Sequence, residues 1–210
     1  MTKVAVLLSA FNGSHFIREQ IDSILNQKDV ETELIVRDDG STDNTREILE
    51  EYKQAGKLTW YTGKNLKAAG SFMDLIHSVV TDAEFIALSD QDDVWLPDKL
   101  YVAVTQLRRM SADKPALYYG KTCLVDRDLK EMEQESVTFV SSTMKQSVIS
   151  SGCTGCTICM NRPLFELLRQ KQMGLTMIHD MWIHKICVAV GGELFLIVSR
   201  IFFTGSMVGM

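Results

Sequence analysis

The sequence predicts an α/β domain with a Rossmann-like, mostly parallel mixed sheet flanked by helices. Short apolar runs typical of buried strands alternate four times with segments whose apolar residues recur at helical spacing. Three of the runs end in polar residues, at 9–14, 38–43 and 89–93, and ligands of such sheets bind beyond the carboxyl ends of the strands. The chain has 210 residues, of which 46% are hydrophobic, so it is long enough to bury a sizeable core.

The alternating part of the chain occupies the first 110 residues. Residues 3–9, 33–37, 58–62 and 85–93 are the predicted strands, and residues 15–27 are the first predicted helix. The second helix is expected to open with a capping box of Asn44 and Glu47. Ser71 is expected to cap the third helix, and Pro97 is expected to be the first residue of a fourth helix that continues to Met110.

The second half of the chain has no βα rhythm of its own. Its predicted strands are residues 116–119, 122–125, 152–160 and a last strand after Gly192, and its predicted helices are residues 163–172 and 179–190. Residues 130–135 are charged and expected to be exposed. We therefore expect residues 1–210 to form a single domain, with residues 111–210 packed on the same sheet.

Charge and hydropathy narrow the class of protein. The net charge is -5 and the sequence has no basic patch, so no nucleic-acid partner is expected. There is no basic segment followed by an apolar one at the start, and no run of about 18 apolar residues that would predict a membrane span. The expected location is cytoplasmic, with peripheral association at the inner face of the membrane left open.

An acidic cluster follows the fourth predicted strand. Asp90, Asp92 and Asp93 come directly after the apolar run 85–88, where like charges repel one another and burial disfavours the charged form. A hard cation such as Mg²⁺ or Mn²⁺ would relieve this cost, because oxygen ligands suit it and because Mg²⁺ is usually shared between carboxylates and substrate phosphates. The competing interpretation is a solvated acidic turn before a helix.

Two further carboxylates are candidates for the same site. Asp39 ends the second strand, where a carboxylate can accept hydrogen bonds from a ribose hydroxyl or a base N–H, although Asx turns also explain it. Asp180 lies at the start of a predicted helix. A carboxylate at this position is explained either by the favourable helix dipole or by a role as a general base. His184 lies four residues on, and therefore on the same helix face as Asp180.

Several other kinds of site are disfavoured. The spacing of Cys153, Cys156 and Cys159 suggests a metal hook, but no fourth ligand is evident, so structural cysteines are preferred to zinc. The glycine fingerprint of dinucleotide-binding proteins, the phosphate loop of NTPases and the nucleophile elbow of hydrolases are all missing from the sequence.

Taken together, the motifs resemble family 2 glycosyltransferases of the GT-A fold, in particular bacterial rhamnosyltransferase-like enzymes of surface polysaccharide synthesis. The resemblance extends to about Gly192. It rests on residues 6–13 (VLLSAFNG), 20–27 (QIDSILNQ), 37–45 (RDDGSTDNT), 88–100 (LSDQDDVWLPDKL), 152–157 (GCTGCT) and 179–182 (HDMW). It implies a nucleotide-sugar-binding half, residues 1–110, followed by an acceptor-binding half, residues 111–210.

The resemblance also implies a role for each candidate residue. Asp39 would hold the base, Asp90 would contact the ribose or the metal shell, Asp92 would bind a divalent metal (Mg or Mn), Asp93 would support it, and Asp180 would be the catalytic base. The remaining residues implied to line the nucleotide pocket are Ser9, Ala10, Phe11, Asn65 and Gly70.

The implied reaction is an inverting transfer of a hexosyl or rhamnosyl group. The donor would be a UDP- or dTDP-sugar and the acceptor a glycan or lipid-linked saccharide; oligomer formation is left open. Family members usually continue past the last strand into a segment that contains Arg-x-His. Here Arg200 is followed by an apolar stretch without that histidine, so a C-terminal truncation is expected. The alternatives are an inactive nucleotide-sugar-binding module that acts through partners, and a nucleotidyltransferase.

Overall fold

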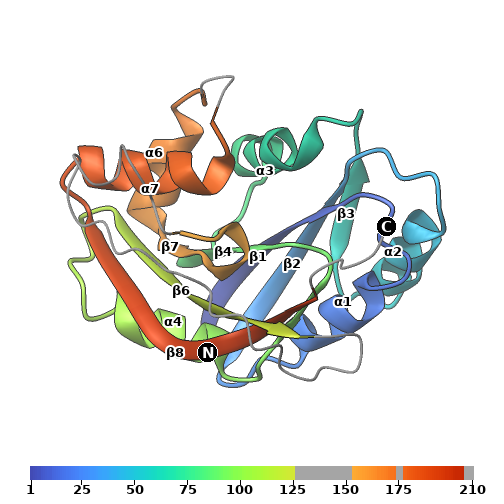
Figure 1. Ribbon diagram of the computed structural model, residues 1–210, viewed down its shortest axis with the longest axis horizontal. Coiled ribbons are helices and arrows are strands. Elements are labelled where there is room, and N and C mark those ends of the chain that lie inside the picture. Colours follow the sequence, from blue (N-terminus) through green and yellow to red (C-terminus); the bar gives the residue numbers. More distant parts are fainter. Residues whose placement is uncertain (126–152, 174–176, 206–210) are drawn as a thin grey trace.

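The computed structural model of the chain describes residues 1–125, 153–173 and 177–205 (Figure 1). Side chains are described up to residue 120 and, in the later segments, up to residue 196. The predicted exposed segment 130–135 lies outside the described residues.

One mixed sheet organises the domain, with strand order β3-β2-β1-β4-β7-β6-β8-β5. Neighbouring strands are parallel from β3 to β4 and between β6 and β8, whereas β7 runs antiparallel to both of its neighbours and β5 is antiparallel to β8. This confirms the predicted mostly parallel mixed sheet. The strands are β1 (Thr2–Ala10), β2 (Val30–Asp38), β3 (Thr59–Thr62), β4 (Phe85–Ser89), β5 (Asp93–Trp95), β6 (Ala116–Val125), β7 (Cys159–Asn161) and β8 (Glu193–Gly205).

Helices cover both faces of the sheet, and the alternation of side chains along β1 shows why. Val4, Val6 and Leu8 pack on one face, and Ala5 and Leu7 pack on the other. The first face is covered by α1 (Ile17–Leu25), α2 (Thr45–Gln54) and α4 (Lys99–Leu107), and the second by α3 (Lys67–Ser78), α6 (Arg162–Arg169) and α7 (His179–Ala189) (Figure 1). A strand buried on both faces is apolar along its buried length, as residues 4–8 are.

The strand register brings the polar strand ends together. Ala10 of β1 is paired with Asp38 of β2, and Leu8 of β1 is paired with Ser89 of β4. Because these three strands are parallel, the loops that follow them leave the sheet at the same edge. The acidic segment after β4 therefore lies beside the loops that follow β1 and β2.

Two expected helix starts are wrong. α3 begins at Lys67, and Ser71 is buried one turn inside it, where its hydroxyl accepts a hydrogen bond from Ser9 Oγ at 2.6 Å. α4 begins at Lys99 rather than Pro97. The carbonyl of Pro97 instead accepts a hydrogen bond from the backbone N–H of Lys28, so a tertiary contact holds the proline outside the helix.

Two other local predictions are also corrected. Asn44 makes no side-chain capping bond; Asp43 takes that place and accepts from the backbone N–H of Thr45 at 3.1 Å. The predicted strand 152–160 is a 3₁₀ turn, η1 (Gly155–Thr157), followed by the short β7. The hydroxyl of Thr157 donates to the carbonyl of Thr154 at 2.6 Å, which closes the turn locally and interrupts the strand.

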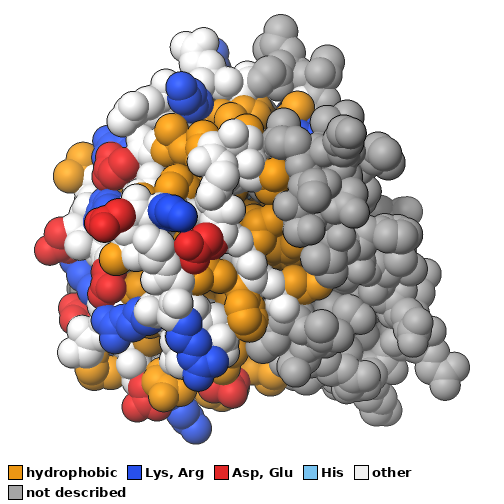
Figure 2. Space-filling view, turned by 90° about the vertical axis from the view of Figure 1, so that its left-hand side faces the viewer, with side chains coloured by type: hydrophobic (Ala, Val, Ile, Leu, Met, Phe, Trp, Pro, Cys, Tyr) orange, Lys and Arg blue, Asp and Glu red, His pale blue; other side chains and the backbone are white. Residues whose placement is uncertain are grey.

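The surface of the described part shows two features relevant to partners. Acidic and basic side chains are interspersed over the face drawn in Figure 2 rather than gathered by sign. Among the described residues, none of the helices combines the length and the apolarity needed to cross a bilayer.

Candidate functional site

A cavity of about 320 Å³ lies beyond the carboxyl ends of β1, β2 and β4. The loop after each of these strands contributes to its wall, and the start of α3 closes the remaining side. Six of the residues implicated by the sequence line it. The full lining is Ser9, Phe11, Asp39, Asn65, Lys67, Ala68, Asp90, Gln91 and Asp92.

Gln91 joins the acidic loop to the loop after β1. Its side-chain oxygen accepts from the backbone N–H of Phe11 at 2.8 Å, and its side-chain nitrogen donates to the carbonyl of Phe11 at 3.0 Å. Gly13 leaves room for this contact, because a Cβ at that position would lie 2.2 Å from Gln91 Oε1. The two loops that form opposite walls of the cavity are thus held together by one side chain.

Asp39 is buried, and Arg37 holds it from behind. Both the guanidinium of Arg37 and the backbone N–H of Leu66, the latter at 2.8 Å, donate to Asp39 Oδ1. Arg37 is itself fixed by Asp74, whose Oδ2 accepts from Arg37 Nε at 2.8 Å and from the hydroxyl of Tyr61 at 2.9 Å. The orientation of Asp39 therefore depends on groups outside the cavity.

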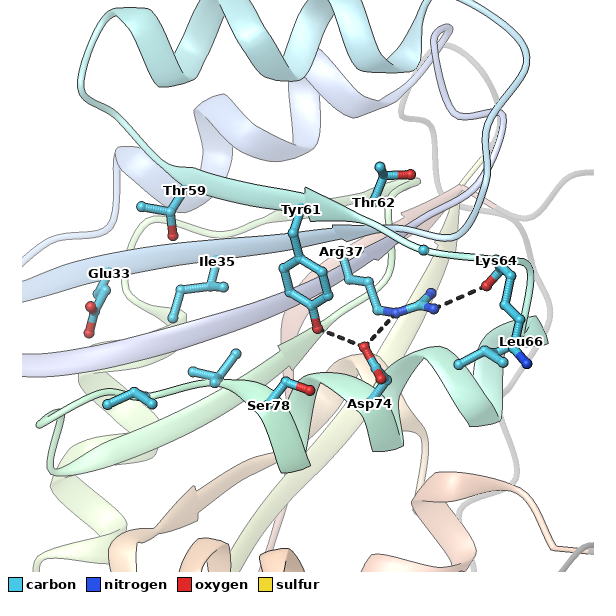
Figure 3. A pocket seen from close by; sticks show the side chains of 13 residues that line it. Glu33, Ile35, Arg37, Thr59, Tyr61, Thr62, Lys64, Leu66, Asp74 and Ser78 are labelled. Atoms are coloured by element: carbon cyan, nitrogen blue, oxygen red, sulfur yellow. Dashed lines mark hydrogen bonds and ion pairs between the residues drawn. The ribbon is translucent and has the colours of Figure 1, made fainter.

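The anchors of Arg37 lie in a second cavity of about 760 Å³ between β2, β3 and α3 (Figure 3). Arg37 and Tyr61 project into it from the strands and meet Asp74, which projects from the helix. Arg37 Nη2 also donates to the carbonyl of Lys64 at 3.1 Å. Arg37 is only 2% exposed, so it is a buried link between the two cavities.

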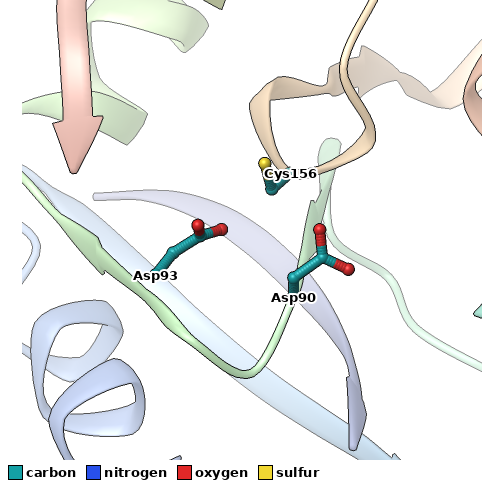
Figure 4. A group of neighbouring side chains, drawn as sticks. All are labelled: Asp90, Asp93 and Cys156. Carbon is teal, nitrogen blue, oxygen red and sulfur yellow. The ribbon is translucent and has the colours of Figure 1, made fainter. Parts of the chain in front are cut away.

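A group of potential metal-ligand atoms joins the acidic loop to η1, with Asp93 and Cys156 buried and Asp90 partly exposed. Single ligand atoms of Asp90, Asp93 and Cys156 are within 4.8 Å of one another, with both aspartates projecting toward the thiol (Figure 4). Burial, and then repulsion from Asp92, raises the pKa of Asp90 to about 6. Burial also raises the pKa of Asp93, and its Oδ2 has no hydrogen-bond partner among the described residues.

Lys99 supplies positive charge beside this group. It is 3% exposed, its ammonium donates to the carbonyl of Cys156 at 2.8 Å, and it lies 3.2 Å from the centre of the Trp95 ring. Burial lowers the pKa of Lys99, whereas the charges of Asp93 and Asp90 oppose that shift. One ammonium thus faces several carboxylates, and the balance of charge around the acidic loop is negative.

The carboxylates fit a hard divalent cation. Asp90 and Asp92 both line the cavity, and burial raises the pKa of each, as expected for acidic groups withdrawn from water. Their oxygens are the ligands that Mg²⁺ and Mn²⁺ prefer. The Cys156 thiol suits such a cation poorly, because burial raises its pKa well above the usual value and keeps it protonated.

Asp180 lies in the first turn of α7, and backbone N–H groups hold its carboxylate. Met181 donates to its Oδ1 at 2.6 Å, and the backbone of Gly155 in η1 also donates to it. Burial raises the pKa of Asp180, and its charge contributes to the raised pKa of Asp90. Asp180 is therefore close enough to the acidic loop to share its electrostatic environment.

The other residues implicated by the sequence lie behind the cavity surface. Ala10 and Asp93 are buried, and neither lines the cavity. Gly70 is in α3, where a Cβ would lie 2.8 Å from Leu66 Cβ, so it permits close packing of the helix start. Cys153, Cys156 and Cys159 are free and buried, and within the described part of the chain only Cys156 joins a group with metal-ligand spacing.

Four residues at or near the site were not implicated as site residues by the sequence analysis: Arg37, Gln91, Lys99 and Cys156. Arg37 and Lys99 could have been found from the sequence, because each is a charged residue within an otherwise apolar strand or helix. A charged side chain buried at such a position needs an ionic or hydrogen-bonding partner. Cys156 gave a signal through its spacing with Cys153 and Cys159, but not the one that pairs it with Asp90 and Asp93. Gln91 gave none, because its contacts depend on a segment far away in the sequence.

The chain is similar in sequence to a known protein family and to several characterised proteins. A family profile described as "Glycosyl transferase family 2" matches residues 5–168. The chain is 37% identical to dTDP-rhamnosyl transferase RfbG of Shigella flexneri over 131 residues, which cover 57% of this chain and 45% of that protein. The chain spans about half the length of the curated relatives it matches.

Solved structures share the fold at low sequence identity. The structure of S. aureus TarS 1-349 has a TM-score of 0.74 and 18% sequence identity, and the similarity covers 98% of this chain and 61% of TarS 1-349. A complex of the same protein with UDP-GlcNAc is also similar. A mannosyltransferase from Pyrobaculum calidifontis in complex with GDP-Man and Mn²⁺ has a TM-score of 0.68 at 15% identity, covering 96% of this chain and 56% of that one.

Proposed function

Because the chain belongs to glycosyl transferase family 2, we propose that it transfers a hexosyl or rhamnosyl group from a nucleoside diphosphate sugar to a hydroxyl group. The acceptor is a glycan or a lipid-linked saccharide of cell-surface polysaccharide synthesis. One observation carries the proposal: Asp39, Asp90 and Asp92 line one cavity at the ends of three parallel strands. A base and a ribose can donate hydrogen bonds to such carboxylates, and a diphosphate could be held by them through a shared cation.

The donor lies along this cavity. Asp39 accepts a hydrogen bond from the base, while Ser9, Phe11 and Asn65 line the nucleoside and Asp90 faces the ribose. The names of relatives support a pyrimidine nucleotide, since RfbG is described as a dTDP-rhamnosyl transferase and TarS has been solved with UDP-GlcNAc. Residues 1–110 form the donor half of the domain and residues 111–210 form the acceptor half.

Asp92 would hold a divalent cation at the acidic loop, and Asp93, buried behind the cavity surface, would support that loop. When bound, such a cation neutralises the charge that develops on the leaving diphosphate. The negative balance of charge described above supports this arrangement, as does the presence of Mn²⁺ in the complex of the mannosyltransferase that shares the fold.

Asp180 acts on the acceptor. Its carboxylate accepts the proton of the attacking hydroxyl, and a raised pKa makes it a stronger base than an exposed aspartate. The acceptor oxygen forms a bond to the anomeric carbon as the bond between that carbon and the diphosphate oxygen breaks. Attack from the face opposite the diphosphate inverts the anomeric centre and requires no covalent enzyme intermediate. Lipid-linked acceptors would place the reaction in the cytoplasm, at the inner face of the membrane.

A binding assay followed by a turnover assay tests the proposal. UDP, dTDP and GDP are added with and without Mn²⁺, and a ligand at a hundred times its Kd should stabilise the protein by about 2.7 kcal/mol. The absence of any shift with metal present would remove the donor site. Asp92→Ala should bind nucleotide equally with and without Mn²⁺.

Turnover separates an enzyme from an inactive binding module. Asp180→Asn should abolish sugar transfer while leaving nucleoside diphosphate affinity unchanged. Full turnover in that variant would exclude Asp180 as the base. Nucleotide binding without transfer to any glycan or lipid-linked acceptor would support the inactive module instead.

A further inference from the structure

We infer that Arg37 is a specificity-determining positioning residue, which makes the donor site select uracil or thymine over guanine by occupying one oxygen of Asp39. The inference rests on the proposed donor site, in which Asp39 contacts the base. Arg37 does not line the donor cavity and does not touch the nucleotide. It acts through the carboxylate that does.

The hydrogen bonds of Asp39 leave one oxygen open. Oδ1 accepts from the Arg37 guanidinium and from the Leu66 backbone N–H, and a carboxylate oxygen has two lone pairs, so Oδ1 is saturated. Oδ2 accepts no hydrogen bond from the described residues. Asp39 is 2% exposed and lines the cavity, so Oδ2 is the acceptor left for a base.

One open oxygen fits one kind of base edge. Uracil and thymine offer a single N–H between two carbonyl groups, which Oδ2 can accept. Guanine offers two adjacent donors, and a carboxylate satisfies both only by using both of its oxygens. A guanine at this site would leave one buried donor unpaired, and that penalty is what makes polar sites selective.

The position of Arg37 is set by a chain of contacts that leads away from the nucleotide. Asp74 accepts from Arg37 Nε at 2.8 Å and from the Tyr61 hydroxyl at 2.9 Å, and Lys64 supplies a carbonyl at 3.1 Å (Figure 3). Ser71 Oγ accepts from Arg37 Nη1 at 3.1 Å. These contacts occupy all three nitrogens of the guanidinium, so it cannot turn away from Asp39.

The shared fold leaves the choice of base to individual side chains. One solved structure of this fold is in complex with UDP-GlcNAc and another is in complex with GDP-Man. Selectivity must therefore come from local groups such as Arg37 and Asp39, since the sheet and its loops serve both nucleotides.

The test measures the Kd of UDP and of GDP by titration calorimetry with Mn²⁺ present. Wild type should prefer UDP. Arg37→Gln opens a lone pair on Asp39 Oδ1, so GDP gains a hydrogen bond, and the preference for UDP should fall by about tenfold. Arg37→Lys should shift the preference in the same direction. Tyr61→Phe, which loosens only Asp74, should shift it less and keeps the inference testable if the Arg37 variants do not fold.

The matched control is Arg46→Gln. Arg46 Nε donates to Asp38 Oδ2 at 2.8 Å, so this variant also breaks an arginine–carboxylate bond beside the site but leaves Asp39 untouched. Its preference for UDP should equal that of wild type. A wild type that prefers GDP, or folded Arg37 variants with an unchanged ratio, would overturn the inference alone. A wild type that binds neither nucleotide would overturn the proposed function with it.

Discussion

Gly13→Ala tests whether the link between the acidic loop and the loop after β1 is built as the structure shows. The new Cβ would lie 2.2 Å from Gln91 Oε1 and 2.6 Å from Gln91 Cδ. Gln91 must then leave, which breaks its two hydrogen bonds to the backbone of Phe11. The backbone at residue 13 should stay in place, because its N–H still donates to Thr45 Oγ1 at 2.9 Å.

The expected cost follows from these contacts. Two hydrogen bonds of partly exposed groups contribute about 1–2 kcal/mol together. Alanine in place of glycine restricts the unfolded chain and returns about 0.4–1 kcal/mol. The free energy of unfolding should therefore fall by about 1 kcal/mol, and the affinity for UDP should fall by up to about tenfold as the two walls of the cavity separate.

The sign of the effect should reverse when Gln91 is absent. In a Gln91→Ala background the three atoms that lie nearest to the new methyl group are gone, so Gly13→Ala should stabilise the protein by about 0.4–1 kcal/mol. Urea denaturation of the two single variants, the double variant and wild type gives the coupling energy directly. Equal destabilisation of both backgrounds by Gly13→Ala would refute the assigned role of Gln91.

Three further changes probe the packing around the site. Asn161→Ala removes hydrogen bonds to the N–H groups of Ala116 and Leu164 and to the carbonyl of Lys114. Urea denaturation should therefore show that the free energy of unfolding falls by about 2–3 kcal/mol. Asn161→Asp should lose less, because it keeps both acceptor contacts. Burial lowers the pKa of His179 to about 4, so the free energy of unfolding of wild type should fall as the pH falls from about 6.5 toward 4. In His179→Asn this part of the pH dependence should be missing. A variant with the same pH profile as wild type would contradict the prediction. Burial lowers the pKa of Lys99 to about 7, so Lys99→Met should cost about 3 kcal/mol near pH 6.5, where it leaves buried carboxylates uncompensated. The loss should be smaller at pH 5, where the carboxylates bind protons, and at pH 8, where the wild-type amine is mostly uncharged. Melting curves at the three pH values measure the difference, and equal losses would exclude a charge effect.

The strands and their polar ends could be predicted from the sequence because both are local. Residues 4–8 are apolar throughout, which is typical of a strand buried on both faces, and the loops that follow such parallel strands must leave the same edge of the sheet. The same features identify Asp39, Asp90 and Asp92 in the sequence, and the structure places all three in one cavity. This prediction required only that the strands run parallel in one sheet.

The errors arose where a tertiary contact replaces a local one. Ser71 has the chemistry of a helix cap, yet its hydroxyl binds Ser9 and Arg37 inside the helix. Likewise, nothing local to residues 152–160 shows that β7 inserts beside β4 and brings Cys156 to Asp90 and Asp93. A pattern in the sequence gives the hydrogen-bonding capacity of a side chain but does not identify its partner.

The electrostatics of the crevice connect the fold to the proposed chemistry. Burial is the first cause of the raised pKa of Asp90, Asp92, Asp93 and Asp180, and the charges of Asp92 and Asp180 add to it at Asp90. Lys99 opposes this repulsion at Asp90 and Asp93 only. A cation bound with a diphosphate would favour the charged forms of the loop carboxylates. The pKa of Asp180 on α7 is raised by burial, which suits a base acting on a hydroxyl near neutral pH.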